Sequence, residues 1–152
     1  MPLIRERYLL IDMIARNKNV LQIINFALNF PASGNGVFGI QNLNISIPKG
    51  KTISIVGESG SGKTLTALSI LKLNPNTSVI SDESQIIFSG RDILKIDKRE
   101  LNAIRGNEIS MIFQEPLSSL NPLHTVEKQI SEALILHKTK KSQDIRGAVI
   151  DL

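Results

Sequence analysis

Short segments in which apolar and polar positions alternate occupy much of the first third of the chain, as expected for β-strands with one buried face. The clearest lie at residues 21–30 and 37–47. Between them, residues 31–36 contain one proline and two glycines, which indicates a turn. Two alternating segments joined by a turn predict an antiparallel β-layer.

Two later segments predict buried strands, the first because it is short and rich in β-branched residues and the second because it is mostly apolar. They are residues 52–56, with the sequence TISIV, and residues 109–113, with the sequence ISMIF. Residues 85–88 predict one more strand. Helical spacing and capping residues predict helices over residues 3–15, 63–73, 97–105, 125–137 and from Ser142 onward. The predicted fold class is α/β, with a mixed core sheet after the antiparallel layer and the start of a helical subdomain after that.

Composition excludes several classes of protein. The 152 residues contain no cysteine, which excludes disulfide frameworks and thiolate metal sites. No apolar run reaches the roughly 18 residues that a membrane span requires, and the N-terminus lacks the apolar core of a signal peptide. The net charge of +4 favours an anionic partner. We do not expect nucleic acid, because the basic segment at residues 137–146 has no aromatic residues between its charges.

Residues 57–64, with the sequence GESGSGKT, fit the phosphate-binding pattern G-x-x-x-x-G-K-[ST]. The pattern stands between a predicted strand and a predicted helix. Its glycines let backbone amides approach a phosphate, and the helix start adds positive potential. Lys63 is expected to reach the β- and γ-phosphates, and the Thr64 hydroxyl to ligate Mg²⁺. The nucleotide-binding candidates are Gly57, Glu58, Ser59, Gly60, Ser61, Gly62, Lys63 and Thr64.

Most of the chain resembles the ATP-binding subunits of ABC transporters, most closely the importers of oligopeptides and dipeptides, and among them the microcin C type. The resemblance depends on VGESGSGKT at residues 56–64, RGNEISMIFQEPLSSLNPLHT at residues 105–125 and EKQISEALILHK at residues 127–138. It implies a P-loop ATPase fold, with residues 21–152 as the N-terminal part of the ATP-binding domain and residues 1–20 as an unassigned extension.

The same resemblance implies ligands, partners and a location. The ligands would be ATP and Mg²⁺. The partners would be transmembrane permease subunits and a second ATP-binding subunit in a head-to-tail dimer. The location would be peripheral, on the cytoplasmic face of the bacterial inner membrane.

Two further residue roles follow from the resemblance. Gln114 matches the Q-loop glutamine, which in the family contacts the Mg²⁺ and the attacking water, and whose loop couples to the membrane subunits. Phe30 stands where the family has the aromatic residue that stacks on adenine. From residue type alone, Gln114 could equally be a solvated side chain and Phe30 a core residue.

Other groups that ATP hydrolysis requires do not follow the loop in this sequence. Phosphoryl transfer needs a carboxylate that holds Mg²⁺, and after residue 64 no run of four apolar residues ends in Asp. Asp12 follows an apolar run but precedes the phosphate loop. The family's LSGGQ-type signature, D-loop and switch histidine are absent, and His124 and His137 stand too early to be that histidine; we expect both on the surface. We therefore expect a truncated subunit, ending before these motifs, that does not hydrolyse ATP alone.

Several alternatives stay open at this point. The chain could be an intact ATPase subunit with further sequence after Leu152, a non-hydrolysing remnant that binds nucleotide, or a fragment that only docks on a permease through residues 114–122. A small P-loop GTPase is disfavoured, because no Asn-Lys-x-Asp segment is present to read guanine.

Overall fold

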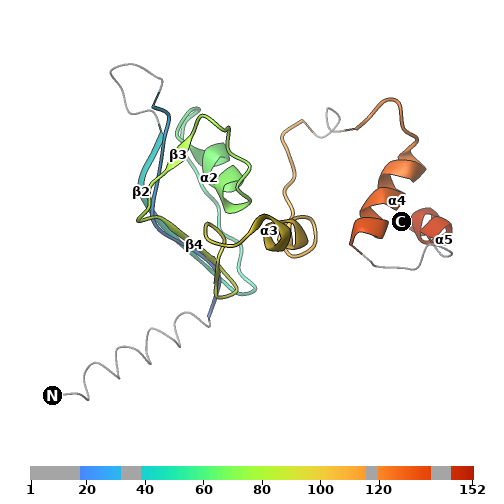
Figure 1. The fold of residues 1–152 in the computed structure, drawn as a ribbon, viewed down its shortest axis with the longest axis horizontal. Coiled ribbons are helices and arrows are strands. Elements are labelled where there is room, and N and C mark those ends of the chain that lie inside the picture. Colours follow the sequence, from blue (N-terminus) through green and yellow to red (C-terminus); the bar gives the residue numbers. More distant parts are fainter. Residues whose placement is uncertain (1–17, 32–38, 116–119, 138–144) are drawn as a thin grey trace, which may run out of the picture. The chain divides into compact units, whose positions relative to one another are not determined.

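The computed structural model describes residues 18–31, 39–115, 120–137 and 145–152. The helix predicted over residues 3–15 and most of the turn predicted over residues 31–36 lie outside these ranges. The chain divides between Leu101 and Asn102 into two compact units, and each has its own arrangement of elements (Figure 1).

The first unit is built on an antiparallel sheet whose centre is the long strand β1 (Asn19–Asn29). β2 (Gly39–Pro48) pairs along one side of β1, and β4 (Gln85–Phe88) pairs along the other. The short strands β3 (Val79–Ile80) and β5 (Arg91–Asp92) pair with the end of β1 and with β4, respectively. The antiparallel layer predicted from the alternating segments is therefore confirmed, and the predicted strand at β4 joins it (Figure 1).

Alternation along β1 places its apolar side chains in the core of this unit. Leu21 and Ile23 are buried, and beyond a shift in register Phe26 and Leu28 are completely buried. Side chains from β4 and from the chain after it add to this core: Ile86, Phe88, Ile93 and Leu101. Burial of this aliphatic and aromatic surface is the main stabilising contribution, because apolar area removed from water contributes about 25 cal/mol per Å².

Helix α2 (Lys63–Ile70) ends before residue 73, the predicted end. Lys72 adopts a left-handed conformation with a φ of 49°, and its amide donates to the Ser69 carbonyl at 3.1 Å. The Leu73 amide donates to the Leu68 carbonyl at 2.9 Å, which completes a C-terminal cap of the Schellman type. The capping hydrogen bonds therefore stop the helix before its apolar pattern stops.

Helix α3 (Lys98–Ile104) starts where the capping pattern predicts. The Asp97 Oδ1 atom accepts a hydrogen bond from the Glu100 amide at 2.7 Å, as an N-cap residue does. The Glu100 carboxylate lies 3.6 Å from the Arg91 guanidinium, so it pairs with a neighbouring strand instead of closing a reciprocal capping box.

The second unit contains helices α4 (Val126–Leu136) and α5 (Ile145–Ile150). Thr125 Oγ1 accepts from the Lys128 amide at 3.2 Å, which confirms the predicted cap of α4. The Arg146 Nε atom on α5 lies 3.6 Å from the Glu127 carboxylate on α4. Ser142, the predicted start of the last helix, lies outside the described residues.

The two buried strands predicted at residues 52–56 and 109–113 are wrong: neither segment forms a strand of the sheet, although Ile109 makes an isolated bridge to Arg105. Val56 and Ile112 are each 91% exposed. The physical reason is that a strand needs a partner, and within the described ranges no strand pairs with either segment. The predicted mixed core sheet is therefore not formed by the described residues, which make only the antiparallel sheet.

Candidate functional site

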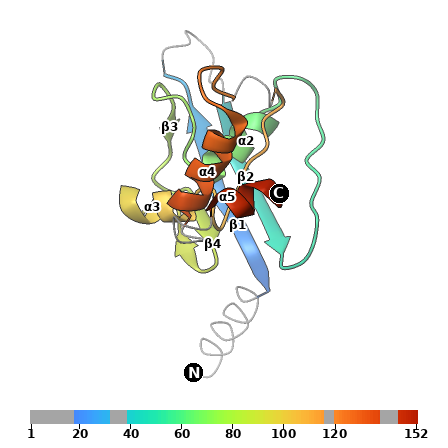
Figure 2. The same cartoon turned by 90° about the vertical axis from the view of Figure 1, so that its right-hand side faces the viewer.

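The predicted phosphate loop connects the extended segment at residues 51–56 to α2. Figure 2 shows this segment running from the end of β2 to the start of α2 without joining the sheet. A turn closes the middle of the loop, where the Ser61 amide donates to the Glu58 carbonyl at 3.2 Å. Gly60 and Gly62 have φ values of 83° and 91°, which side-chain-bearing residues adopt only at a cost. The loop therefore needs glycine at both positions.

The Lys63 side chain turns back into this loop. Its Nζ atom donates to the Gly57 and Glu58 carbonyls, each at 2.7 Å, and lies 3.3 Å from Ser61 Oγ. The ammonium group is therefore placed by three oxygen atoms of the loop itself. A lysine ammonium has three donors, and here each meets a loop oxygen. The positive charge of Lys63 is therefore held next to the N-terminus of α2.

Several backbone amides at the same place lack a protein acceptor. Among the described residues, the Ser61 amide is bonded within the turn, but the amides of Gly60, Gly62, Lys63 and Thr64 donate to no protein group. The first amides of a helix have no partner within the helix, and they carry its positive end. Free amides beside a lysine ammonium form a donor set that suits a phosphate group.

Close packing also fixes the two outer glycines of the loop. A Cβ atom added to Gly57 would lie 2.7 Å from Ser61 Oγ. A Cβ atom added to Gly62 would lie 3.2 Å from Cγ1 of Ile40, a buried residue of β2. The contact of Ile40 with the loop could not be predicted from the sequence, because an apolar residue at the start of a strand gives no sign of what packs on it.

We expect Gly62→Ala to destabilise the protein by about 1–2 kcal/mol, through the left-handed backbone and the approach of Ile40. Gly50→Ala is a matched control, because Gly50 also has a positive φ of 71° but nothing lies within 4 Å of an added Cβ atom. Urea denaturation should give a larger loss of unfolding free energy for Gly62→Ala than for Gly50→Ala. Equal losses would show that Ile40 does not crowd the loop.

The other two predicted site residues lie apart from the loop in sequence. Phe30 directly follows β1 and is half-buried. It belongs to the same end of the sheet as the loop, because Leu28 pairs with Ile40 and Ile40 contacts Gly62. Gln114 is exposed and belongs to the second unit, where it follows the extended segment at residues 109–113. The roles of both residues stay predictions.

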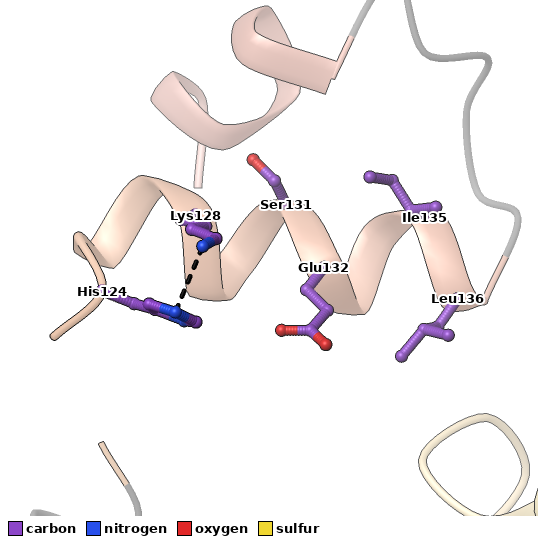
Figure 3. A pocket seen from close by; sticks show the side chains of 6 residues that line it. All are labelled: His124, Lys128, Ser131, Glu132, Ile135 and Leu136. Carbon is purple, nitrogen blue, oxygen red and sulfur yellow. Dashed lines mark hydrogen bonds between the residues drawn. The ribbon is translucent and has the colours of Figure 1, made fainter. Parts of the chain in front are cut away.

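A second feature, on α4, was not predicted from the sequence. A hollow of about 480 Å³ is lined by described residues of α4 and by His124, which precedes the helix. The lining residues of α4 are Lys128, Ser131, Glu132, Ile135 and Leu136 (Figure 3). The Lys128 Nζ atom lies 3.1 Å from His124 Nε2. His124 and His137, both expected at the surface, are only partly exposed.

In the described part of the chain no cluster of acidic, histidine or cysteine side chains could hold a metal ion, and no helix is long and apolar enough to span a membrane.

Comparison with known proteins adds evidence that is independent of this geometry. The sequence profile of the ABC transporter family matches residues 40–150. The chain is 41% identical over 133 residues to a peptidoglycan transport ATP-binding protein, YejF of Agrobacterium fabrum. It is 37% identical over 137 residues to the oligopeptide transport ATP-binding protein OppD of Bacillus subtilis. It is 41% identical over 126 residues to the dipeptide transport ATP-binding protein DppD of Lactococcus lactis.

These matches cover most of this chain but a minor part of each relative. They span 88%, 90% and 83% of this chain, and 24%, 38% and 36% of the respective relatives. Among solved structures, the ATP-binding cassette MJ0796, a dimer bound to ADP and Pi, matches with a TM-score of 0.69 at 24% identity. That match covers 86% of this chain and 54% of the cassette, and it supports the predicted fold class.

Proposed function

Because this chain belongs to the ABC transporter family, we propose that it binds ATP as part of an ATP-binding subunit of a peptide importer. The observation that supports this most directly is the loop at residues 57–64, whose lysine ammonium and free backbone amides gather in one place. Those donors match the charge and hydrogen-bonding needs of a triphosphate. The ATP-binding proteins of this family give the same expectation for the ligand.

In this proposal the loop residues bind the phosphates of the nucleotide, and Phe30, outside the loop, binds the base. The amides of Gly60, Gly62 and Lys63 bind phosphate oxygen atoms, and the Lys63 ammonium leaves its loop carbonyls to bind the β- and γ-phosphates. Phe30 stacks on the adenine from the adjacent end of β1. Glu58, Ser59 and Ser61 hold the loop in shape through the turn and through the contacts to Lys63.

Mg²⁺ would be held mainly by the nucleotide. Thr64 is exposed in the first turn of α2, so its hydroxyl is available as a ligand. Mg²⁺ in such sites keeps several water ligands and takes one or two protein ligands together with phosphate oxygens. Gln114 is proposed as a second contact of the ion. When bound, the ion neutralises phosphate charge. The chain's own residues bind and orient the nucleotide.

The proposed cargo and partners come from the relatives. Two of the relatives named above are transport proteins for an oligopeptide and a dipeptide, and the YejF relative is named for peptidoglycan transport. We accordingly propose peptides as the cargo class. The partners would be permease subunits and a second ATP-binding subunit at the membrane surface. The alternative of a non-hydrolysing nucleotide-binding chain makes the same demands on the loop, so one binding experiment tests both.

The proposed function is tested by titrating the full chain with ATP, with and without Mg²⁺, by calorimetry. Thr64→Val replaces the hydroxyl by a methyl group and so removes an oxygen ligand of Mg²⁺. We expect it to weaken binding of Mg-ATP about tenfold, as for loss of one ligand to a charged group, and to change binding of metal-free ATP by less than about twofold.

Thr77→Val is the control, because Thr77 is an exposed threonine outside the loop. It should leave both affinities unchanged. A wild-type chain that binds no ATP in either condition would contradict the proposed function. Equal weakening of both forms by Thr64→Val would contradict the assignment of Thr64 to the ion.

A further inference from the structure

The Lys63 ammonium is held in the phosphate loop by one side chain as well as by the backbone. Two of its three contacts are to the carbonyls of Gly57 and Glu58, at 2.7 Å each. The third is to Ser61 Oγ, at 3.3 Å. An ammonium group has donors only, so the Ser61 hydroxyl oxygen accepts in this contact. Of the three contacts, this is therefore the one that a side-chain substitution can remove.

Gly57 provides the room that the Ser61 side chain occupies. A Cβ atom added to Gly57 would lie 2.7 Å from Ser61 Oγ and 3.3 Å from Ser61 Cβ. Unlike Gly60 and Gly62, Gly57 does not have a positive φ, so its φ does not call for glycine. What calls for glycine at residue 57 in this structure is the Ser61 side chain that packs against it. The oxygen atom that packs there is the same one that accepts from Lys63.

The Ser61 contact competes with a phosphate for the ammonium group. In the proposed function Lys63 binds the β- and γ-phosphates, so its donors exchange loop oxygens for phosphate oxygens. The affinity depends on the difference between the hydrogen bonds that are formed and those that are given up. A hydroxyl oxygen carries no net charge, and charge-assisted hydrogen bonds to a phosphate are stronger. The exchange is favourable, but the Ser61 contact that is lost reduces the gain.

We propose that Ser61 is a positioning residue that restrains Lys63 in the empty loop and thereby lowers the affinity for the triphosphate. The inference rests on the proposed function, since it assumes that Lys63 binds the phosphates of a nucleotide. It gives the Ser61 hydroxyl an effect opposite to that of a ligand-binding group. Loss of a hydroxyl that donates to a phosphate, or that keeps the loop in shape, would weaken binding. Loss of one that restrains Lys63 strengthens it.

The test is Ser61→Ala in the full chain, titrated by calorimetry with ATP and with inorganic tripolyphosphate, which has the phosphates without the base. The variant removes the hydroxyl but keeps the turn, because the Ser61 backbone amide is the group that donates to the Glu58 carbonyl. We expect both ligands to bind about two- to fivefold more tightly, the effect of one uncharged acceptor that no longer competes. The two factors should agree, because Ser61 acts on Lys63 and so on the phosphates alone.

Ser54→Ala is the matched control, because Ser54 is an exposed serine that precedes the loop. It should leave both affinities unchanged. The inference is overturned if Ser61→Ala binds the ligands as the wild type does or more weakly, if only one ligand binds more tightly, or if Ser54→Ala produces the same gain. If neither the wild type nor Ser61→Ala binds either ligand, the proposed function itself is contradicted.

Discussion

Lys63→Ala should weaken ATP binding by at least about 100-fold. The Nζ atom stands within hydrogen-bonding distance of three loop oxygens, at the point where the free amides of the loop and of α2 gather. Hydrogen bonds to charged groups contribute about 1.5–3 kcal/mol each, and a lysine that bridges two phosphates makes at least two. Loss of about 2.7 kcal/mol corresponds to a 100-fold change in Kd. Calorimetric titration of the full chain with ATP measures it.

Two variants distinguish the effect of the position and shape of the Lys63 side chain on ATP affinity from the effect of its positive charge. Lys51→Ala removes one positive charge from an exposed lysine outside the loop, and we expect less than about a twofold change, because salt screens exposed charges. Lys63→Arg keeps the charge but replaces a compact ammonium by a planar fork. It should bind ATP far more weakly than the wild type. Similar affinities for Lys63→Ala and Lys51→Ala would show that Lys63 acts only through net charge.

The phosphate loop could be predicted from sequence because its information is local. The spacing from Gly57 to Thr64 fixes which residues can turn with a positive φ, and the structure has Gly60 and Gly62 in that conformation. The caps at Asp97 and Thr125 are local in the same sense, since each side chain reaches an amide three residues on. Residues that act within one turn of chain are therefore the ones that the sequence specifies best.

Features that depend on distant partners were harder to predict. The strand pattern at residues 52–56 marks a segment that can be buried, but burial also requires a neighbouring strand, and none of the described residues supplies one. The contact between Ile40 and Gly62 and the hydrogen bond from the Asn25 amide to Asn44 Oδ1 join residues 19 or more positions apart. No period in the sequence reveals such pairs.

Phe26→Ala should lower the free energy of unfolding by about 3–5 kcal/mol, the second large effect that we expect. Phe26 is completely buried in β1, between the two register shifts, so truncation leaves a cavity that the surrounding strands cannot close. Since domains are stable by only about 5–15 kcal/mol, this change removes a large share of the total. Urea denaturation followed by circular dichroism measures the loss.

Val56→Ala is the comparison for Phe26→Ala. The sequence pattern predicts that Val56 is buried, whereas the side chain is exposed in the structure. Val56 is 91% exposed and belongs to no strand, so we expect a change below about 0.5 kcal/mol. A loss above about 1 kcal/mol would mean that Val56 packs against other apolar side chains in solution. Phe26 is buried whether or not residues 52–56 join a sheet. The loss measured for Phe26→Ala is therefore the reference value for a buried side chain, with which the Val56→Ala result is compared.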